Sequence, residues 1–195
     1  MKTSHHQAKP TVLYLVRHAE SLYVEGANRT RGLSVRGRDA ALKVEKQLID
    51  KEIDLFISSP YLRAVDTIQP LAKAMKHEII LIEDLRERTL GRTTDEFLEA
   101  KRKLYKDKAF SFPDGESSLV AQERIVKVME SILITYPGKD IVMGTHGDIM
   151  TLLLNHYDSQ FDYDFWKSIT MPDIYCLEFL KKDLKKVTRL WQNEE

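Results

Sequence analysis

Five side chains of this sequence have the types that chemistry on an anion requires, and each follows an apolar run. They are Arg17, His18, Arg63, Glu87 and His146. Guanidinium groups match the oxygens of a dianion such as phosphate. Histidine titrates near neutrality, and a carboxyl group can give or take a proton. Together they could supply a nucleophile, charge stabilisation and a general acid, as phosphoryl transfer through a covalent intermediate requires.

A metal site is an alternative for part of this set. His18, His146 and Glu87 have the composition of a two-histidine, one-carboxylate metal site. Arg17 and Arg63 would place two fixed cations beside a divalent ion and repel it. We therefore expect an anion site, with no metal ion and no other cofactor.

Ordinary surface roles are the other alternative. Arg63 could pair with Asp54 or Asp66 on the surface, and Glu87 lies in a segment, 83–88, where carboxylates and arginines alternate. Such a pattern is typical of solvated ion pairs. The structure has to decide between these roles and a shared site.

Short apolar runs predict the strands that would position these side chains. The runs are 12–16, 55–57, 79–82 and 141–143. Each is apolar throughout, which is typical of a strand buried on both faces. Because parallel strands end at one edge of a sheet, the residues that follow them can converge there. Two further strands, at 174–180 and about 186–191, are expected to pair as a hairpin on the sheet edge.

Helical patterns alternate with these strands. Helices are expected at 34–50, from 59 onwards, and at 94–105, 117–135 and 148–156. Ser34 is a predicted N-cap, and Ser59-Pro60 is typical of a helix start, which would put Arg63 in a first helical turn. Pro70 is expected to bend or end that helix. The alternation predicts an α/β fold, a three-layer α/β/α sandwich with a mostly parallel sheet.

Length and charge limit the function classes. The chain has 195 residues, and Lys plus Arg and Asp plus Glu number 30 each. We expect a single domain over 1–195, with residues 1–10 as a flexible tail. The balanced charge does not favour nucleic acid or a membrane surface as a partner. The amino-terminal segment has no apolar signal region, so we expect a cytoplasmic protein. The sequence leaves the oligomeric state open.

A polar excursion, 91–116, is expected to act as a lid over the site. The basic cluster 101–103 in its helix is predicted to be a solvated face. Arg29 and Arg31, in the loop after the first strand, either help to hold an anionic substrate or are solvated.

The motifs together resemble the histidine phosphatase superfamily, with its phosphoglycerate mutase-like fold. The matching stretches are Arg17-His18-Ala19-Glu20-Ser21, Leu33-Ser34-Val35-Arg36-Gly37, Ser58-Ser59-Pro60-Tyr61-Leu62-Arg63-Ala64, Leu85-Arg86-Glu87, Gly115-Glu116-Ser117 and Thr145-His146-Gly147. They occur in family order from about Val12 to Leu180. The resemblance is to the broad-specificity phosphatase branch.

The resemblance implies a role for each residue of the set. His18 would be the nucleophile that becomes a phosphohistidine. Arg17, Arg63 and His146 would hold the phosphoryl oxygens, and Glu87 would protonate the leaving oxygen.

Ser117, in a lid element, would contact the substrate.

Two positions depart from the family pattern. Ala19 replaces the usual glycine, so the turn must accept a Cβ. Val24 stands where the glycolytic mutases have an asparagine, which counts against that subgroup.

We therefore expect a histidine acid phosphatase-type phosphomonoesterase that hydrolyses small phosphorylated molecules. A cofactor-dependent phosphoglycerate mutase is the first alternative. A non-catalytic phosphate-binding domain on the same fold is the second. The substrate itself cannot be named from the sequence.

Overall fold

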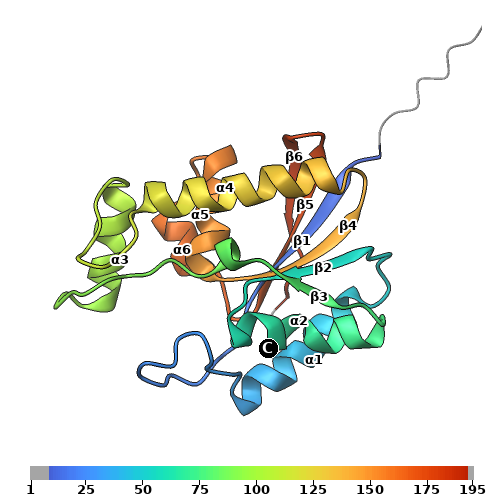
Figure 1. Cartoon of the computed structure of the whole chain (residues 1–195), viewed down its shortest axis with the longest axis horizontal. Helices are drawn as coiled ribbons and strands as arrows, with labels where there is room; N and C mark the ends of the chain where they lie inside the picture. The colour runs from blue at the N-terminus through green and yellow to red at the C-terminus, as the bar shows by residue number, and fades with distance from the viewer. Residues whose placement is uncertain (1–8, 193–195) are drawn as a thin grey trace, which may run out of the picture.

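The computed structural model describes residues 9–192, and its centre is a six-stranded sheet (Figure 1). The strand order is β3-β2-β4-β1-β5-β6. The strands are β1 (Thr11–Arg17), β2 (Leu55–Ser58), β3 (Ile79–Leu81), β4 (Asp140–Thr145), β5 (Asp173–Leu180) and β6 (Asp183–Arg189). Residues 1–8 of the expected tail lie outside the described residues, while Lys9 pairs with Asp140 at 3.0 Å.

Four neighbouring strands are parallel, and this brings the expected strand ends together. β1 and β2 flank β4, and β3 pairs with the other side of β2. In register, Arg17 lies opposite Thr145, and Ser58 lies opposite Gly144. β5 and β6 complete the sheet in antiparallel pairing, as the hairpin prediction required.

Helices cover both faces of the sheet. The helices are α1 (Val35–Leu48), α2 (Leu62–Ala74), α3 (Phe97–Lys106), α4 (Ser118–Thr135), α5 (Gly147–Tyr157) and α6 (Tyr163–Ser168), with a short 3-10 helix η1 (Glu83–Leu85). Alternate residues of β1 reach opposite cores, as the pleat of a strand requires. Leu13 and Leu15 pack in the core with α4 and α5, whereas Tyr14 and Val16 pack in the core with α1 and α2. The expected α/β/α layers are confirmed.

The third apolar run differs from the expectation of a buried strand. β3 lies at the edge of the sheet, and Ile80 and Leu81 are 42% and 55% exposed. An apolar run does not reveal whether a strand is central or lateral. β3 has one strand neighbour, so it cannot be enclosed as β4 is.

The start of α2 also corrects the sequence interpretation. Its N-cap is Tyr61, with no side-chain cap, so Ser59-Pro60 precedes the helix. The Ser59 hydroxyl accepts from the Tyr61 N–H at 3.2 Å and so orders the turn before the helix. Arg63 still lies in the first turn. Pro70 does not end α2, which continues to Ala74.

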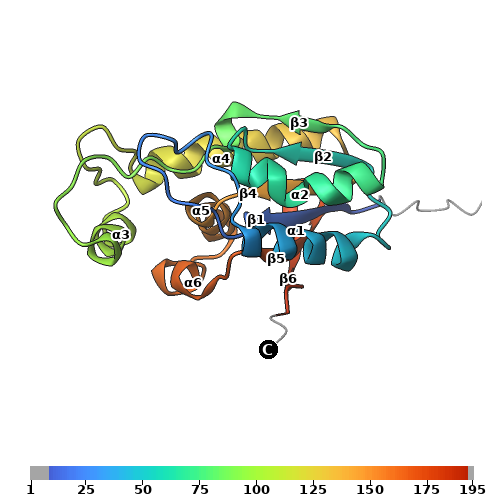
Figure 2. The ribbon, with the colours of Figure 1, turned by 90° about the horizontal axis from the view of Figure 1, so that it is seen from below.

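The excursion and the loop after β1 extend beyond the edge toward which β1 points (Figure 2). α3 lies there beside α6, away from the body of the sheet. A small apolar cluster of Ala100, Leu104 and Phe112 holds the excursion together. Across residues 9–192 no helix is both long and apolar enough to cross a bilayer.

Candidate active site

His18 follows β1 and is held as a neutral imidazole with one defined tautomer. Its Nδ1 lies 2.8 Å from the carbonyl oxygen of Ala19, and Arg63 Nε lies 3.1 Å from its Nε2. A carbonyl oxygen only accepts and a guanidinium only donates, so Nδ1 carries the hydrogen and Nε2 the lone pair. Burial, followed by the charge of Arg63, lowers the pKa of His18 from 6.5 to about 3. Nε2 therefore carries no proton at neutral pH.

The turn after His18 accepts the Cβ of Ala19. Ala19 is fully buried, and its N–H donates to the Thr67 hydroxyl at 2.9 Å. That hydroxyl in turn donates to the Arg63 carbonyl at 2.7 Å. Helix α2 thus fixes the turn and Arg63 together.

Arg63 is buried, with 1% of its surface exposed, which excludes a surface pair with Asp54 or Asp66. Its Nη1 donates to the carbonyl of Asn28 at 2.6 Å, and its guanidinium lies 4.9 Å from the ring centre of Tyr61. Burial lowers the pKa of Arg63 to about 10, so it stays a cation at neutral pH.

Arg17 and His146 come from neighbouring strand ends. Arg17 Nη1 donates to the carbonyl of Ile169 at 2.7 Å. The rings of His18 and His146 meet edge to face, with centres 5.3 Å apart. His146 Nε2 lies 2.8 Å from the Ser59 hydroxyl. Burial lowers the pKa of His146 well below 6.5, and the neighbouring His18 and the charges of the nearby arginines lower it further.

Several buried polar atoms of this region have no hydrogen-bond partner within residues 9–192. They include Arg17 Nε, Arg31 Nε, Thr145 Oγ1 and His146 Nδ1. The charge of Arg31 lowers the pKa of both His18 and His146, so Arg31 is close enough to act on both imidazoles. Buried donors without partners are rare in proteins and are typical of sites built for a ligand. These donors suit an oxyanion.

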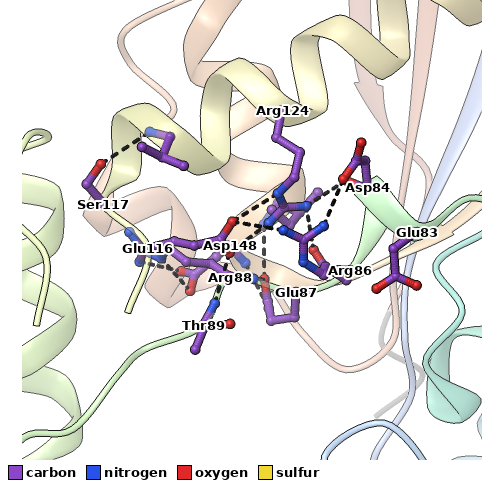
Figure 3. A network of polar contacts seen from close by, with 12 residues as sticks. Glu83, Asp84, Arg86, Glu87, Arg88, Thr89, Glu116, Ser117, Arg124 and Asp148 are labelled. Atoms are coloured by element: carbon purple, nitrogen blue, oxygen red, sulfur yellow. Dashed lines mark hydrogen bonds and ion pairs between the residues drawn. The ribbon is translucent and has the colours of Figure 1, made fainter. Parts of the chain in front are cut away.

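Glu87 follows η1, and backbone N–H groups hold its carboxyl group. Oε1 accepts from the N–H groups of Arg88 at 2.9 Å and Ile149 at 3.3 Å, and Oε2 accepts from that of Asp148 at 3.2 Å. Burial, followed by the negative charge of Asp148, raises the pKa of Glu87. The expected alternating ion pairs do form around it, but they use Asp84, Arg86, Glu116 and Arg124 (Figure 3).

Three predicted residues lie elsewhere or act differently. Ser117 caps α4 by accepting from the N–H of Val120 at 3.2 Å, apart from the contacts around Glu87 (Figure 3). A substrate contact by Ser117 stays a prediction. Arg29 pairs with Glu83 on the surface at 2.7 Å. Lys101 corrects the expected solvated face, because it is only 5% exposed and pairs with Asp148.

Comparison with known proteins agrees with this geometry. The profile of the histidine phosphatase superfamily (branch 1) matches residues 13–193. The chain belongs to this superfamily. A relative in Bacillus subtilis (strain 168), described as an uncharacterized phosphatase PhoE, is 26% identical over 148 residues, covering 74% of this chain and 76% of the relative.

Solved structures of similar fold include both phosphatases and a mutase. A mycobacterial glucosyl-3-phosphoglycerate phosphatase superposes with a TM-score of 0.73 at 19% identity, over 94% of this chain and 99% of its own. YhfR of Bacillus stearothermophilus superposes with a TM-score of 0.73 at 22% identity, over 90% of this chain and 94% of its own. A phosphoglycerate mutase of Bacillus anthracis superposes with a TM-score of 0.71 at 17% identity, over 92% of each chain. At these identities they show the fold alone.

Several residues of the candidate site are not predicted from the sequence. Ser59 is predicted as a helix cap, although its hydroxyl contacts His146. Thr67 lies four residues after Arg63, one turn along the same helix, and that spacing could have indicated it. Asp148 directly follows His146-Gly147, but its partners Arg88 and Lys101 are far away in sequence. Nothing in the sequence pairs them.

Proposed function

We propose that this protein is a phosphatase that hydrolyses small phosphomonoesters through a phosphohistidine on His18. The observation that carries the proposal is the Nδ1–H tautomer of His18, with its Nε2 lone pair beside buried, unpaired oxyanion donors. Membership of the superfamily and the phosphatase-named relative support it.

In the first step, Nε2 of His18 attacks phosphorus while the bond from phosphorus to the ester oxygen breaks. Arg17, Arg63 and His146 bind the phosphoryl oxygens, with His146 donating through Nδ1 while Nε2 accepts from the Ser59 hydroxyl. Glu87 gives its proton to the leaving oxygen, so the alcohol departs neutral. Fixed donors stabilise the charge that develops on the phosphoryl oxygens.

In the second step, water attacks phosphorus and the P–N bond breaks. Glu87, now a carboxylate, takes a proton from this water, and inorganic phosphate leaves. Nε2 of His18 regains its lone pair, and Glu87 regains its proton. Atoms and charge balance over the two steps.

The test is to mix the enzyme with labelled substrate, stop the reaction without acid because the expected phosphoryl group is acid-labile, and locate the label on the protein. We expect an acid-labile, base-stable phosphoryl group on His18, and His18→Ala should remove both the label and the turnover of p-nitrophenyl phosphate. His77→Ala, at an exposed histidine, is the matched control and should keep both. Turnover by His18→Ala at the wild-type rate would exclude the mechanism, and binding of phosphate without any turnover by the wild type would favour a phosphate-binding domain.

Val24, which is 50% exposed, supports hydrolysis over isomerisation, because a mutase of this family has an asparagine there. A mutase must also shelter its phosphohistidine from water. With 3-phosphoglycerate and a trace of 2,3-bisphosphoglycerate, phosphate release should exceed formation of 2-phosphoglycerate. The reverse ratio would replace the phosphatase with a mutase.

A further inference from the structure

A buried charge cluster lies directly behind Glu87, and the proposed reaction does not use it. Asp148 is fully buried, and Arg88 binds it with Nε–Oδ2 and Nη2–Oδ1 distances of 3.2 and 3.1 Å. The Tyr105 hydroxyl donates to Oδ1 at 3.1 Å, and Lys101 Nζ contacts Oδ2. A buried carboxylate is tolerated only when such partners replace its water. Here two cations and a hydroxyl do so.

Lys101 is the member of the cluster that comes from the excursion. It belongs to α3, and its ammonium group lies 5.3 Å from the ring centre of Phe97 and 5.6 Å from that of Trp166. Aromatic faces attract a cation and keep water away from it. Lys101 accordingly lies near two aromatic rings, is only 5% exposed and pairs with Asp148.

Asp148 interacts with Glu87 through its backbone and through its charge. Its backbone N–H, at the start of α5, donates to Glu87 Oε2, and its carboxylate adds a negative charge behind the Glu87 carboxyl group. The charged and titratable groups that interact with Glu87 include Arg17, Arg63, Arg88, Lys101, Tyr105 and Asp148. Of these, only Asp148 is a carboxylate.

We propose that Asp148, clamped by Lys101 of α3, is a positioning residue that keeps a proton on Glu87 for the leaving group. This inference rests on the proposed function. Burial and the Asp148 carboxylate favour protonated Glu87, whereas Lys101 and the backbone N–H groups of Arg88 and Asp148 favour the ionised form. Burial and the carboxylate outweigh the groups that oppose them. The same ion pair fastens the excursion to α5, so the position of α3 and the proton of Glu87 are linked.

Two substitutions separate this role from a merely structural one. Asp148→Asn keeps the backbone N–H but removes the negative charge, so Glu87 should lose its proton at lower pH. Lys101→Met keeps the length of the side chain but removes the positive charge, so Glu87 should keep its proton to higher pH. Each shift should be about one pH unit, the size that a nearby charge can produce. A structural role would give shifts of one sign, or none.

The measurement is the alkaline limb of the kcat/KM profile with an alkyl phosphate, together with the ¹³C NMR titration of the Glu87 carboxyl carbon, since both report the free enzyme. Glu87→Gln identifies that carbon by the loss of its signal. Lys103→Met is the matched control, because Lys103 lies on the same helix but pairs with Asp95 at the surface, and it should shift neither readout. Circular dichroism checks the folding of each variant.

Opposite shifts in Asp148→Asn and Lys101→Met would support the proposal. Equal shifts, shifts of one sign, or no shift in the folded variants would overturn it. If Asp148→Asn does not fold, Lys101→Met alone decides, since an unchanged Glu87 titration there contradicts the proposal. The NMR titration needs no turnover. A wild-type protein that hydrolyses no phosphate ester would therefore refute the proposed function while the titration still tests the role of Asp148.

Discussion

Single side chains of the site depart from their ordinary proton affinities in opposite directions. Burial and Arg63 lower the pKa of His18, whereas burial and Asp148 raise that of Glu87. The first shift leaves Nε2 of His18 without a proton, and the second helps Glu87 to retain one. His18 is therefore neutral at neutral pH, and Glu87 keeps its proton to a higher pH than a free carboxyl group does, as the nucleophile and the acid of the proposed reaction require.

The proton of Glu87 should matter most when the leaving group is poor. Glu87→Gln cannot give a proton, so hydrolysis of an alkyl phosphate should fall about 100-fold or more. Hydrolysis of p-nitrophenyl phosphate should fall much less, because p-nitrophenolate leaves without protonation. The kcat/KM values of both substrates measure the ratio, because kcat/KM reports the first step and not the hydrolysis of the phosphohistidine, in which Glu87 acts as the base.

Asp84→Asn is the control for this comparison, since Asp84 is exposed in the same segment and pairs with Arg86. It should leave the ratio of the two rates unchanged. Equal losses for both substrates in Glu87→Gln would show that Glu87 is not the acid.

The sequence predicted which residues would gather, but not their detailed contacts. His18, Arg63 and His146 follow apolar runs, and a parallel sheet brings such positions together. The role of Ser59 could not be read, because one hydroxyl can order a turn or contact a distant histidine. The burial of Lys101 is not apparent from the sequence, because a lysine in a basic run is usually solvated and one of the rings near it, Trp166, is distant in sequence.

At the level of elements, the start of α1 explains a five-residue motif. Ser34 caps the helix by accepting from the Gly37 N–H at 3.0 Å and donates to Glu20 at 2.6 Å. A Cβ on Gly37 would lie 2.0 Å from the carbonyl oxygen of Glu20. The helix therefore starts directly against the chain that follows His18, and only a glycine permits that approach.

Gly37→Ala should accordingly destabilise the protein by about 1–3 kcal/mol, the usual range for overpacking a closed site. The matched control is Gly32→Ala, since its Cβ would meet Asp66 at an ordinary 3.5 Å. Urea denaturation measures both variants. If Gly37→Ala were as stable as Gly32→Ala, the close approach of α1 to Glu20 would be wrong.

Element positions were predictable where periodicity is long and caps are clear, as in α1 and α4. Element positions were not predictable where they depend on which other elements pack alongside. The run 79–82 is apolar, yet its strand lies at the edge because no further strand follows β3 in the sheet order. Pro70 is accommodated inside α2, and the local sequence gives no sign of that.

For the whole molecule, the buried histidines link stability to pH. In the folded state the pKa of His18 is about 3, against 6.5 for a free histidine. Between these values the unfolded chain binds a proton that the folded chain does not. The free energy of unfolding therefore falls as the pH falls through this range, and the contribution is complete above it. His146 shifts in the same direction.

His18→Gln removes one of these groups, so its stability should fall less than that of the wild type between about pH 7 and about pH 4. Urea denaturation across this range gives the two slopes. His77→Gln, at an exposed histidine, should keep the wild-type slope. Identical slopes for wild type and His18→Gln would mean that His18 is not held neutral by the fold.

The contact between Arg63 Nε and His18 Nε2 has one more consequence. The lone pair cannot face phosphorus and an N–H group at the same time, so an arriving dianion must draw the guanidinium away. In the free protein Arg63 covers Nε2 of His18. Acylating or alkylating agents should therefore react first with the exposed imidazoles of His77 and His156. In the proposed reaction, the fold would therefore keep Nε2 of His18 away from other electrophiles until an anionic substrate displaces Arg63.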